Sequence, residues 1–172
     1  TAAASTIRVA DLDLASRLSF FLWGAPPDEE LIDVATAGRL TSPGMLEKQA
    51  RRLLADPRAE ALGSRFAAQW LRLQDLDKVH PDPNFFPNFD ENVGGAMKRE
   101  TEMFFNDLVR RDGSFMDFFT ADYTFVNERL ARHYGIPKVA GNEFRRVAYP
   151  DASRRGVLGH GSVLVQTSLA NR

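Results

Sequence analysis

The chain has 172 residues, of which 44% are hydrophobic and 26% are charged, and its formal net charge is −1. This length and composition are typical of one globular domain with a sizeable core. The near-zero charge and the lack of a basic run exclude the electrostatic footprint of a nucleic-acid-binding protein. No apolar run approaches the roughly 20 residues that span a bilayer. Because the chain has no cysteine, disulfides, thiolate ligands, a cysteine nucleophile and covalent haem attachment through C-x-x-C-H are excluded within it.

Two segments differ in character at the start of the chain. Residues 1–10 are small and polar and lack the basic and apolar regions of a signal peptide, so we expect a linker there. We expect residues 11–172 to form a single helical domain. The chain ends on Asn171-Arg172 directly after an apolar run, which is compatible with cleavage, so we expect this domain to be a fragment or subunit of a larger multidomain protein.

Helical periodicity covers most of the chain. Apolar residues recur at helical spacing, which predicts an all-α fold: an irregular domain of about six to seven helices with a short extended C-terminal arm. Polar caps, glycines and prolines divide the pattern. We expect helices over residues 11–23, 28–37, 43–55, 62–73, 90–111, 115–119 and 127–134. The expected N-caps are Asp11, Asp28, Ser42, Asp90 and Asn127.

Three segments depart from this pattern. Residues 75–90 contain three prolines and cannot continue the preceding helix, so we expect an ordered loop. Residues 143–149, EFRRVAY, favour a short strand or an extended segment. Residues 155–167 are apolar but contain three glycines, and within the C-terminal arm we favour a helix or a helix-like segment there.

The chain has three histidines. None of them stands at the spacing of a paired metal site, so we predict no metal site. We interpret His133 as a cation at a helix C-terminus and His80 as a solvated loop residue. His160 lies between two glycines, which allow a ligand or another backbone to approach closely. Ligation of a haem or metal and tight packing against a neighbouring chain are both open interpretations of His160.

Glu100 falls at the edge of the apolar stripe of the long helix predicted for residues 90–111. A carboxylate in that position requires a partner. Arg129 is a natural candidate, although no sequence pattern selects it. A structural ion pair and a catalytic carboxylate both remain open.

Functional side-chain types are densest in TADYTFVNERLARHYG, residues 120–135. Asn127 can cap a helix, and Glu128 and Arg132 stand at i, i+4 and can pair. The aromatic residues suit a core with hydrogen-bonded phenols. This explains the segment without catalysis, and Tyr123 is kept as a candidate functional group.

The segment GHGSV, residues 159–163, is superficially similar to a hydrolase nucleophile elbow. The elbow requires G-x-S-x-G, and here Leu164 stands where the last glycine would be. The three glycines of this region do not form G-x-G-x-x-G either. We therefore expect neither a serine hydrolase nor a nucleotide site.

Six segments carry a resemblance to a known family. They occur in the order RLSFFLWGAPPDEEL, FAAQWLRL, FPNFDENVGGAMKRETEMFF, DYTFVNERLARHYGIP, FRRV and RRGVLGHGSVLVQTS. Together they resemble the domain of unknown function in large planctomycete-type cytochrome c proteins and their myxobacterial relatives, which precedes a cytochrome-like domain with a C-x-x-C-H haem motif. The resemblance covers about residues 11–168, and the segment over residues 122–137 is its most specific part.

The resemblance implies an exported, redox-associated setting and supplies no catalytic residues. We therefore expect a subunit or domain of a periplasmic or secreted c-type cytochrome-associated oxidoreductase, which helps form the haem or substrate pocket or the interface to the haem-bearing part. Haem c would be held by a partner segment or chain, and the isolated chain would be inactive. The alternative is a non-catalytic scaffold or interaction domain of the same assembly. The candidate catalytic residues are His160, His133, Tyr123 and Glu100, and His160 is also the candidate cofactor-binding residue.

Overall fold

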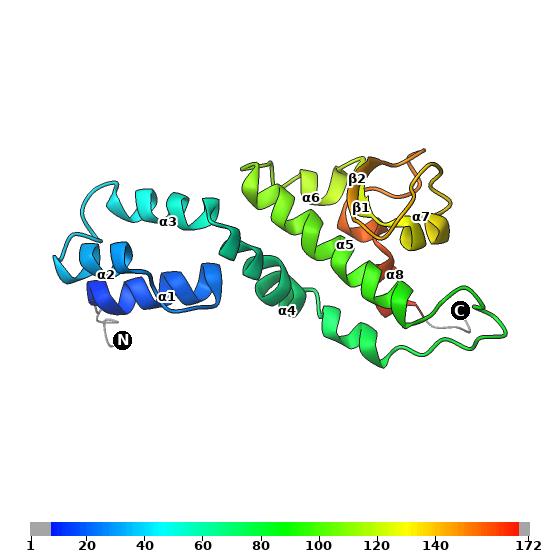
Figure 1. The fold of residues 1–172 in the computed structure, drawn as a ribbon, viewed down its shortest axis with the longest axis horizontal. Coiled ribbons are helices and arrows are strands. Elements are labelled where there is room, and N and C mark those ends of the chain that lie inside the picture. The colour runs from blue at the N-terminus through cyan, green and yellow to red at the C-terminus, as the bar shows by residue number, and fades with distance from the viewer. Residues whose placement is uncertain (1–7, 169–172) are drawn as a thin grey trace, which may run out of the picture. The chain divides into compact units, whose positions relative to one another are not determined.

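The computed structural model describes residues 8–168. This part of the chain is mostly helical and contains one small two-stranded sheet, which confirms the all-α expectation. It divides into two compact units with the boundary after Leu62, here called unit 1 and unit 2 (Figure 1). The single domain expected over residues 11–172 stays a prediction. Most of the expected linker and the terminus at Arg172 lie outside the described residues.

Unit 1 is a small helical unit. It contains α1 (Asp11–Trp23), α2 (Glu29–Thr36), α3 (Met45–Ala55) and η1 (Pro57–Glu60). Its core consists of apolar side chains from each of these elements and from the chain between α2 and α3, among them Leu22, Leu31, Leu40, Leu53 and Ala59. The three predicted helices of this region are therefore present, close to their expected bounds.

Two of the three predicted caps in unit 1 are wrong. Asp28 caps α2 as expected, since its carboxylate accepts the Leu31 N–H at 3.1 Å. Asp11 instead lies inside α1, and its carboxylate accepts the backbone N–H of Leu40 at 2.8 Å. Its acceptor oxygens serve a returning segment of the chain and not the helix start. The helix expected from Pro43 begins at Met45, after Gly44 in a left-handed conformation.

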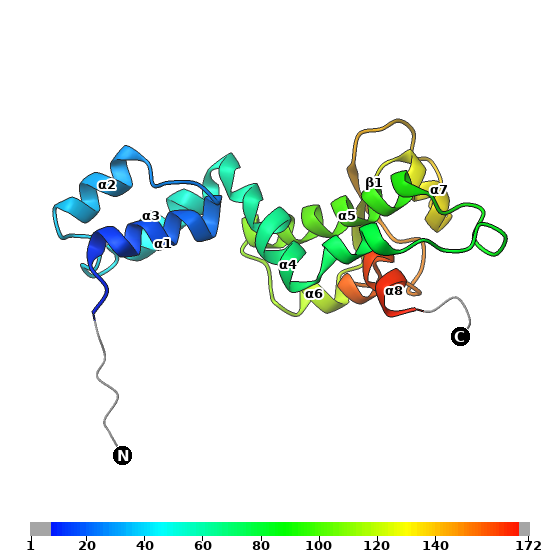
Figure 2. The ribbon, with the colours of Figure 1, turned by 90° about the horizontal axis from the view of Figure 1, so that it is seen from below.

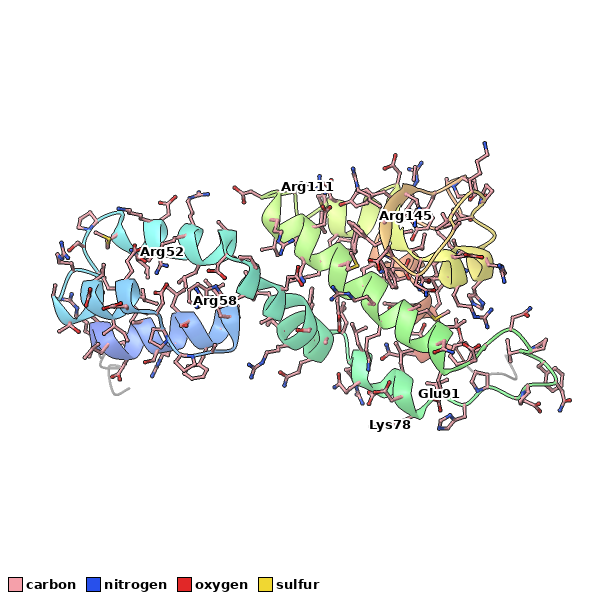
Figure 3. All side chains as sticks on the ribbon, in the orientation of Figure 1. Arg52, Arg58, Lys78, Glu91, Arg111 and Arg145 are labelled. Atoms are coloured by element: carbon pink, nitrogen blue, oxygen red, sulfur yellow. The ribbon has the colours of Figure 1, made fainter. Side chains whose placement is uncertain are left out.

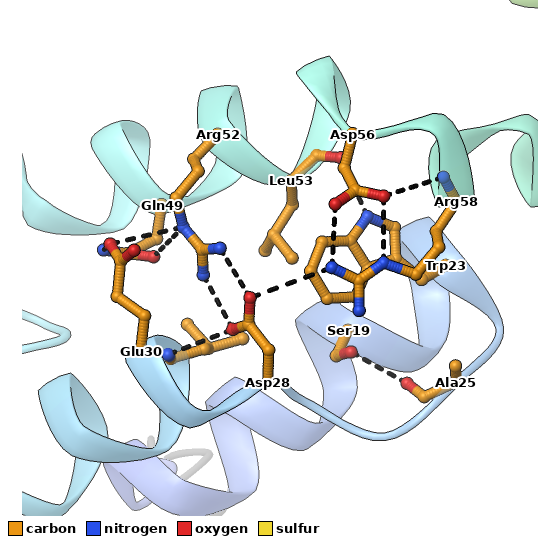
Figure 4. Close-up of polar contacts among 11 residues, drawn as sticks. Ser19, Trp23, Ala25, Asp28, Glu30, Gln49, Arg52, Leu53, Asp56 and Arg58 are labelled. Carbon is orange, nitrogen blue, oxygen red and sulfur yellow. Dashed lines mark hydrogen bonds and ion pairs between the residues drawn. The ribbon is translucent and has the colours of Figure 1, made fainter.

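A polar network joins the helices of unit 1 (Figure 4). Arg52 on α3 donates two hydrogen bonds, of 2.6 and 2.8 Å, to the carboxylate of Asp28. The indole N–H of Trp23 donates to the carbonyl of Leu53 at 2.8 Å, and the Arg58 guanidinium lies 3.5 Å from the centre of the indole ring. These contacts hold α1, α2, α3 and η1 together with paired charges, so the network is structural.

Unit 2 holds the residues of functional interest. Its elements are η2 (Leu62–Ala67, a π-helix), α4 (Ala68–Trp70), η3 (Leu73–Lys78), α5 (Glu91–Arg110), α6 (Asp117–Thr120), β1 (Tyr123–Val126), α7 (Glu128–Tyr134), β2 (Arg145–Ala148), η4 (Val157–Gly159) and α8 (Gly161–Thr167). The long helix α5 contacts η3, α6, β1, α7 and α8, as both ribbon views show (Figures 1 and 2). The buried face of α5 therefore lies at the centre of the core of unit 2.

The sheet of unit 2 was half expected. Strands β1 and β2 are antiparallel, with Tyr123 opposite Ala148 and Val126 opposite Arg145. The strand predicted for residues 143–149 is β2, whereas β1 was not predicted because its four residues directly precede a well-capped helix. The caps of α5 and α7 are as predicted: Asp90 accepts the Val93 N–H and Asn127 accepts the Leu130 N–H.

One helical prediction in unit 2 needs correction, and a second is confirmed. The helix expected over residues 62–73 is divided into η2 and α4, and it stops where Arg72 adopts a left-handed conformation. Gly63 packs so closely against α5 that a Cβ would lie 2.5 Å from the Asn106 side-chain nitrogen. In the C-terminal arm, β2 is extended as predicted and η4 and α8 are helical, so the favoured helical segment over residues 155–167 is confirmed. No helix among the described residues is long and apolar enough to cross a membrane.

Candidate functional site

Glu100 lies at the centre of a buried polar cluster in unit 2. Its side chain is fully buried on α5. The Thr124 hydroxyl on β1 donates to Oε1 at 2.5 Å, and the Tyr134 phenol at the end of α7 donates to Oε2 at 2.6 Å. The Tyr134 oxygen in turn accepts the backbone N–H of Gly161, the first residue of α8, at 2.8 Å. One carboxyl group therefore connects α5 to β1, to α7 and, through Tyr134, to α8.

The environment of Glu100 favours the neutral carboxylic acid. Burial raises its pKa to about 7, although the hydrogen bonds from Thr124 and Tyr134 and the positive charge of Arg154 act in the opposite direction. The buried phenol of Tyr149 belongs to the same cluster, and its pKa is raised by burial and by the Glu100 charge. At slightly acidic pH the acid form of Glu100 is therefore the stable one.

The expected ion pair between Glu100 and Arg129 is wrong. Arg129 Nη2 donates to the carboxylate of Asp90 at 2.7 Å, at the start of α5. Asp90, the N-cap residue of α5, thus pairs with the positive charge of Arg129. Hydroxyl groups and not a guanidinium satisfy Glu100, and sequence spacing gave no signal for Thr124, Tyr134 or Tyr149 as its neighbours.

His160 is the second fully buried titratable group of this region. Its Nδ1 lies 2.9 Å from the Thr101 hydroxyl, which is itself 2.7 Å from the Ser162 hydroxyl. Its ring meets the Phe104 ring edge-on, with centroids 4.9 Å apart. Burial and the charge of Arg154 lower the pKa of His160 to about 3, so the imidazole is neutral at physiological pH.

The other imidazole nitrogen of His160, Nε2, is buried and hydrogen-bonds to no described residue. His160 is fully buried and lines neither of the two cavities beside the loop before α5. A haem iron or a metal ion therefore has no route to Nε2 in this closed arrangement. Cofactor binding by His160 stays a prediction that requires residues 157–167, which comprise η4 and α8, to open.

Tyr123 lies in a different polar cluster. Its phenol donates to the carboxylate of Asp107 at 2.9 Å and accepts from Arg111, and the Arg146 guanidinium lies 3.8 Å from the centre of its ring. Burial and Asp107 raise its pKa to about 12. With its oxygen fully engaged between a carboxylate and a guanidinium, Tyr123 is suited to a structural role. The predicted pair of Glu128 and Arg132 is present at 2.7 Å.

His133 lies at the surface of α7. Partial burial, together with the positive charges of Arg154 and Arg129, lowers its pKa. These neighbours favour the neutral imidazole and oppose the interpretation of His133 as a helix-terminal cation. His133 differs from the other three candidates because it lines a cavity.

That cavity, here called the aromatic cavity, has a volume of about 570 Å³ and lies between the loop before α5 and α8. The loop contributes residues 79–81 and 85–89, and α8 contributes Leu164 and Val165. Phe85 is 73% exposed and Phe86 is 44% exposed, so large apolar side chains face solvent. A neighbouring cavity shares the loop and adds the acidic side chains of the end of η3 and the start of α5, a region marked by Lys78 and Glu91 in Figure 3.

The structure thus brings Glu100 and His160, two of the four candidates, close together. They are connected through Thr101, which follows Glu100 on α5 and hydrogen-bonds to His160. Tyr123 and His133 belong to other clusters. The described residues contain no group of three or more side chains suited to a metal ion. The buried centre around Glu100 and His160 is closed to solvent. The aromatic cavity, by contrast, offers apolar side chains and the imidazole of His133 to a partner.

Comparison with protein families adds one match. The family model described as PSD4, a protein of unknown function (DUF1592), matches residues 9–136. The chain belongs to this family. Within the DUF1592 match lie α5, β1 and α7 with Glu100, Tyr123 and His133, while β2, α8 and His160 follow it. No curated protein and no solved structure matches the chain.

Proposed function

We propose that this DUF1592 chain is an interaction domain of an exported c-type cytochrome-associated oxidoreductase. It provides an apolar pocket or interface for the haem-bearing part, which lies in another segment or chain. The setting is periplasmic or secreted, and the isolated chain carries out no reaction. The sequence resemblance to the domain of cytochrome c proteins supports the setting, and the aromatic cavity supports the role.

The aromatic cavity carries this proposal. Exposed phenylalanines are costly in water, and clustered exposed aromatic residues are typical of surfaces that bind a partner or an apolar ligand. Phe85, Phe86 and Leu164 are large apolar side chains, each at least 40% exposed, and all three line the cavity. A haem edge is a flat apolar surface that such side chains can cover.

The residues of the chain are suited to a haem held elsewhere, and they cannot hold a covalently attached haem c. Without cysteine, the chain cannot attach haem c covalently. His133 and His80 both line the aromatic cavity, and the neutral form of His133 can accept a hydrogen bond or bind a metal. The haem would supply electron transfer, and this chain would supply apolar cover around its edge.

The alternative is a scaffold with no role at the haem. The buried centre around Glu100 and His160 favours it, because both side chains are fully enclosed and each is explained by the elements it connects. On this alternative, the aromatic cavity binds another protein surface and no haem.

A haem c peptide, in which haem is attached to a short peptide through C-x-x-C-H, is the probe that separates these functions. We expect the full chain to bind it with a shift of the haem Soret absorbance. Phe86→Asp places a charge in the cavity and should weaken binding at least about tenfold, since apolar contact is lost and a charge is buried. The matched control, Phe20→Asp, changes a similarly exposed phenylalanine of unit 1 and should bind as the wild type does.

Absence of a Soret shift with the wild-type chain would exclude the haem-contacting role and favour the scaffold. Equal binding by Phe86→Asp and the wild type would place the haem contact away from the aromatic cavity.

A further inference from the structure

The segment that covers the buried centre, residues 157–167, is held by two titratable side chains. It comprises η4 and α8. Glu100 holds it through Tyr134, whose oxygen accepts the Gly161 N–H, and Thr101 holds it through the imidazole of His160. A Cβ on Gly161 would lie 2.5 Å from the Tyr134 oxygen, so the backbone of the segment seals the contact to Glu100.

No cation neutralises Glu100 by direct contact among the described residues. Around its carboxyl lie Thr124 from β1, Tyr134 from α7 and Tyr149 after β2, and the charge that reaches it is that of Arg154. The Arg154 guanidinium is engaged elsewhere: it donates to the Gly159 carbonyl at 2.8 Å and lies 4.3 Å from the centre of the Tyr134 ring. The closed state therefore disfavours an ionised Glu100.

His160 has the opposite preference. Around its ring lie Thr101 and Phe104 from α5 and Ser162 from α8, all uncharged, and the charge that acts on it is again that of Arg154. A second positive charge on the imidazole would be buried without a carboxylate partner. The closed state therefore disfavours a protonated His160.

We propose that Glu100 and His160 form an opposed pair that keeps residues 157–167 closed over a broad pH range. When the segment opens in water, Glu100 loses a proton and His160 gains one. These two changes shift the opening equilibrium in opposite directions with pH, so they offset each other. Either group alone would make the closure pH-sensitive.

The direction of each pKa shift determines how closure of residues 157–167 changes with pH. Burial raises the Glu100 pKa from 4.5 to about 7, so its contribution to closure is complete below pH 4.5 and is lost as pH rises to 7. Burial lowers the His160 pKa from 6.5 to about 3, so its contribution is complete above pH 6.5 and is lost as pH falls to 3. Between about pH 4.5 and 6.5 both groups change protonation on opening, and their effects on closure have opposite signs.

Hydrogen exchange of the α8 amides in the full chain tests this proposal, with protection factors corrected for the intrinsic exchange rate. From pH 5 to pH 7.5, protection in the wild type should change by only about twofold. In Glu100→Gln, which keeps a neutral side chain, protection should rise roughly thirtyfold because only His160 titrates. In His160→Asn, it should fall roughly fiftyfold because only Glu100 titrates. Glu143→Gln changes an exposed residue of unit 2 and should behave as the wild type.

The proposal is overturned if both variants keep the flat profile of the wild type, or if their slopes have the same sign. A measurement on the wild type covers the case in which a variant does not fold. The ¹⁵N chemical shifts of the His160 ring should report a neutral imidazole at pH 5, and a protonated ring at that pH would refute the opposed pair.

Discussion

At the scale of single residues, Tyr134 links the two parts of the buried centre. Its phenol donates to Glu100 and accepts from Gly161, so one oxygen satisfies a carboxyl group and a backbone amide. Tyr123 has the same side chain in a different environment, since its partners Asp107 and Arg111 are partly solvated. An unsatisfied buried polar group costs more than a solvated one, so the two tyrosines should respond differently to loss of the hydroxyl.

Tyr134→Phe is expected to lower the free energy of unfolding by about 1–3 kcal/mol, because it leaves a buried carboxyl oxygen and a buried N–H without a partner. Tyr123→Phe is the matched control, and it should cost less than about 1 kcal/mol because Asp107 and Arg111 are partly exposed and can hydrogen-bond to water instead. Urea unfolding of both variants at pH 6 measures the difference. Equal losses would mean that the Tyr134 hydroxyl contributes no more to stability than the Tyr123 hydroxyl, whose partners are partly exposed.

At the scale of elements, the position of α8 depends on a residue without a side chain. The backbone of Gly161 lies so close to α5 and α7 that a Cβ would come within 2.5 Å of the Tyr134 oxygen and 2.7 Å of the Met97 methyl carbon. Gly95 lies inside α5 with open space around its Cβ position. Substituting alanine for each glycine therefore distinguishes the effect of close packing on stability from the effect of helix propensity.

We expect Gly161→Ala to destabilise the chain by about 1–3 kcal/mol through overpacking and to reduce the hydrogen-exchange protection of α8. Gly95→Ala should be neutral or stabilise by up to about 1 kcal/mol, since alanine is the better helix former. Thermal unfolding and exchange of both variants test this pair. A Gly161→Ala variant as stable as the wild type would show that α8 can move away from α5 at little cost.

The elements also show which features the sequence could predict. The caps of α2, α5 and α7 were correct because a cap depends on residues within one helical turn. Asp11 was assigned wrongly because its carboxylate binds a backbone N–H 29 residues away. Strand β1 escaped prediction because a four-residue strand is defined by its partner β2 and carries little periodicity of its own.

At the scale of the whole molecule, family membership and the helical class were accessible from sequence, while the site was not. The burial of Glu100 was predictable from its place on the apolar stripe. Its partners were not, because Thr124 and Tyr134 lie 24 and 34 residues along the chain. The aromatic cavity depends on a proline-rich loop returning to α8, and no local pattern encodes that contact.

In unit 2 the buried centre around Glu100 and His160 positions α8. Helix α8 in turn forms one wall of the aromatic cavity, which we propose binds a haem-bearing partner. The most direct test is affinity purification of the tagged full chain from the cells that produce it, followed by the absorption spectrum of the reduced assembly. We predict a c-type haem spectrum that is retained in Phe20→Asp and lost in Phe86→Asp. A purified assembly without haem, or one whose haem is retained in both variants, would contradict the account.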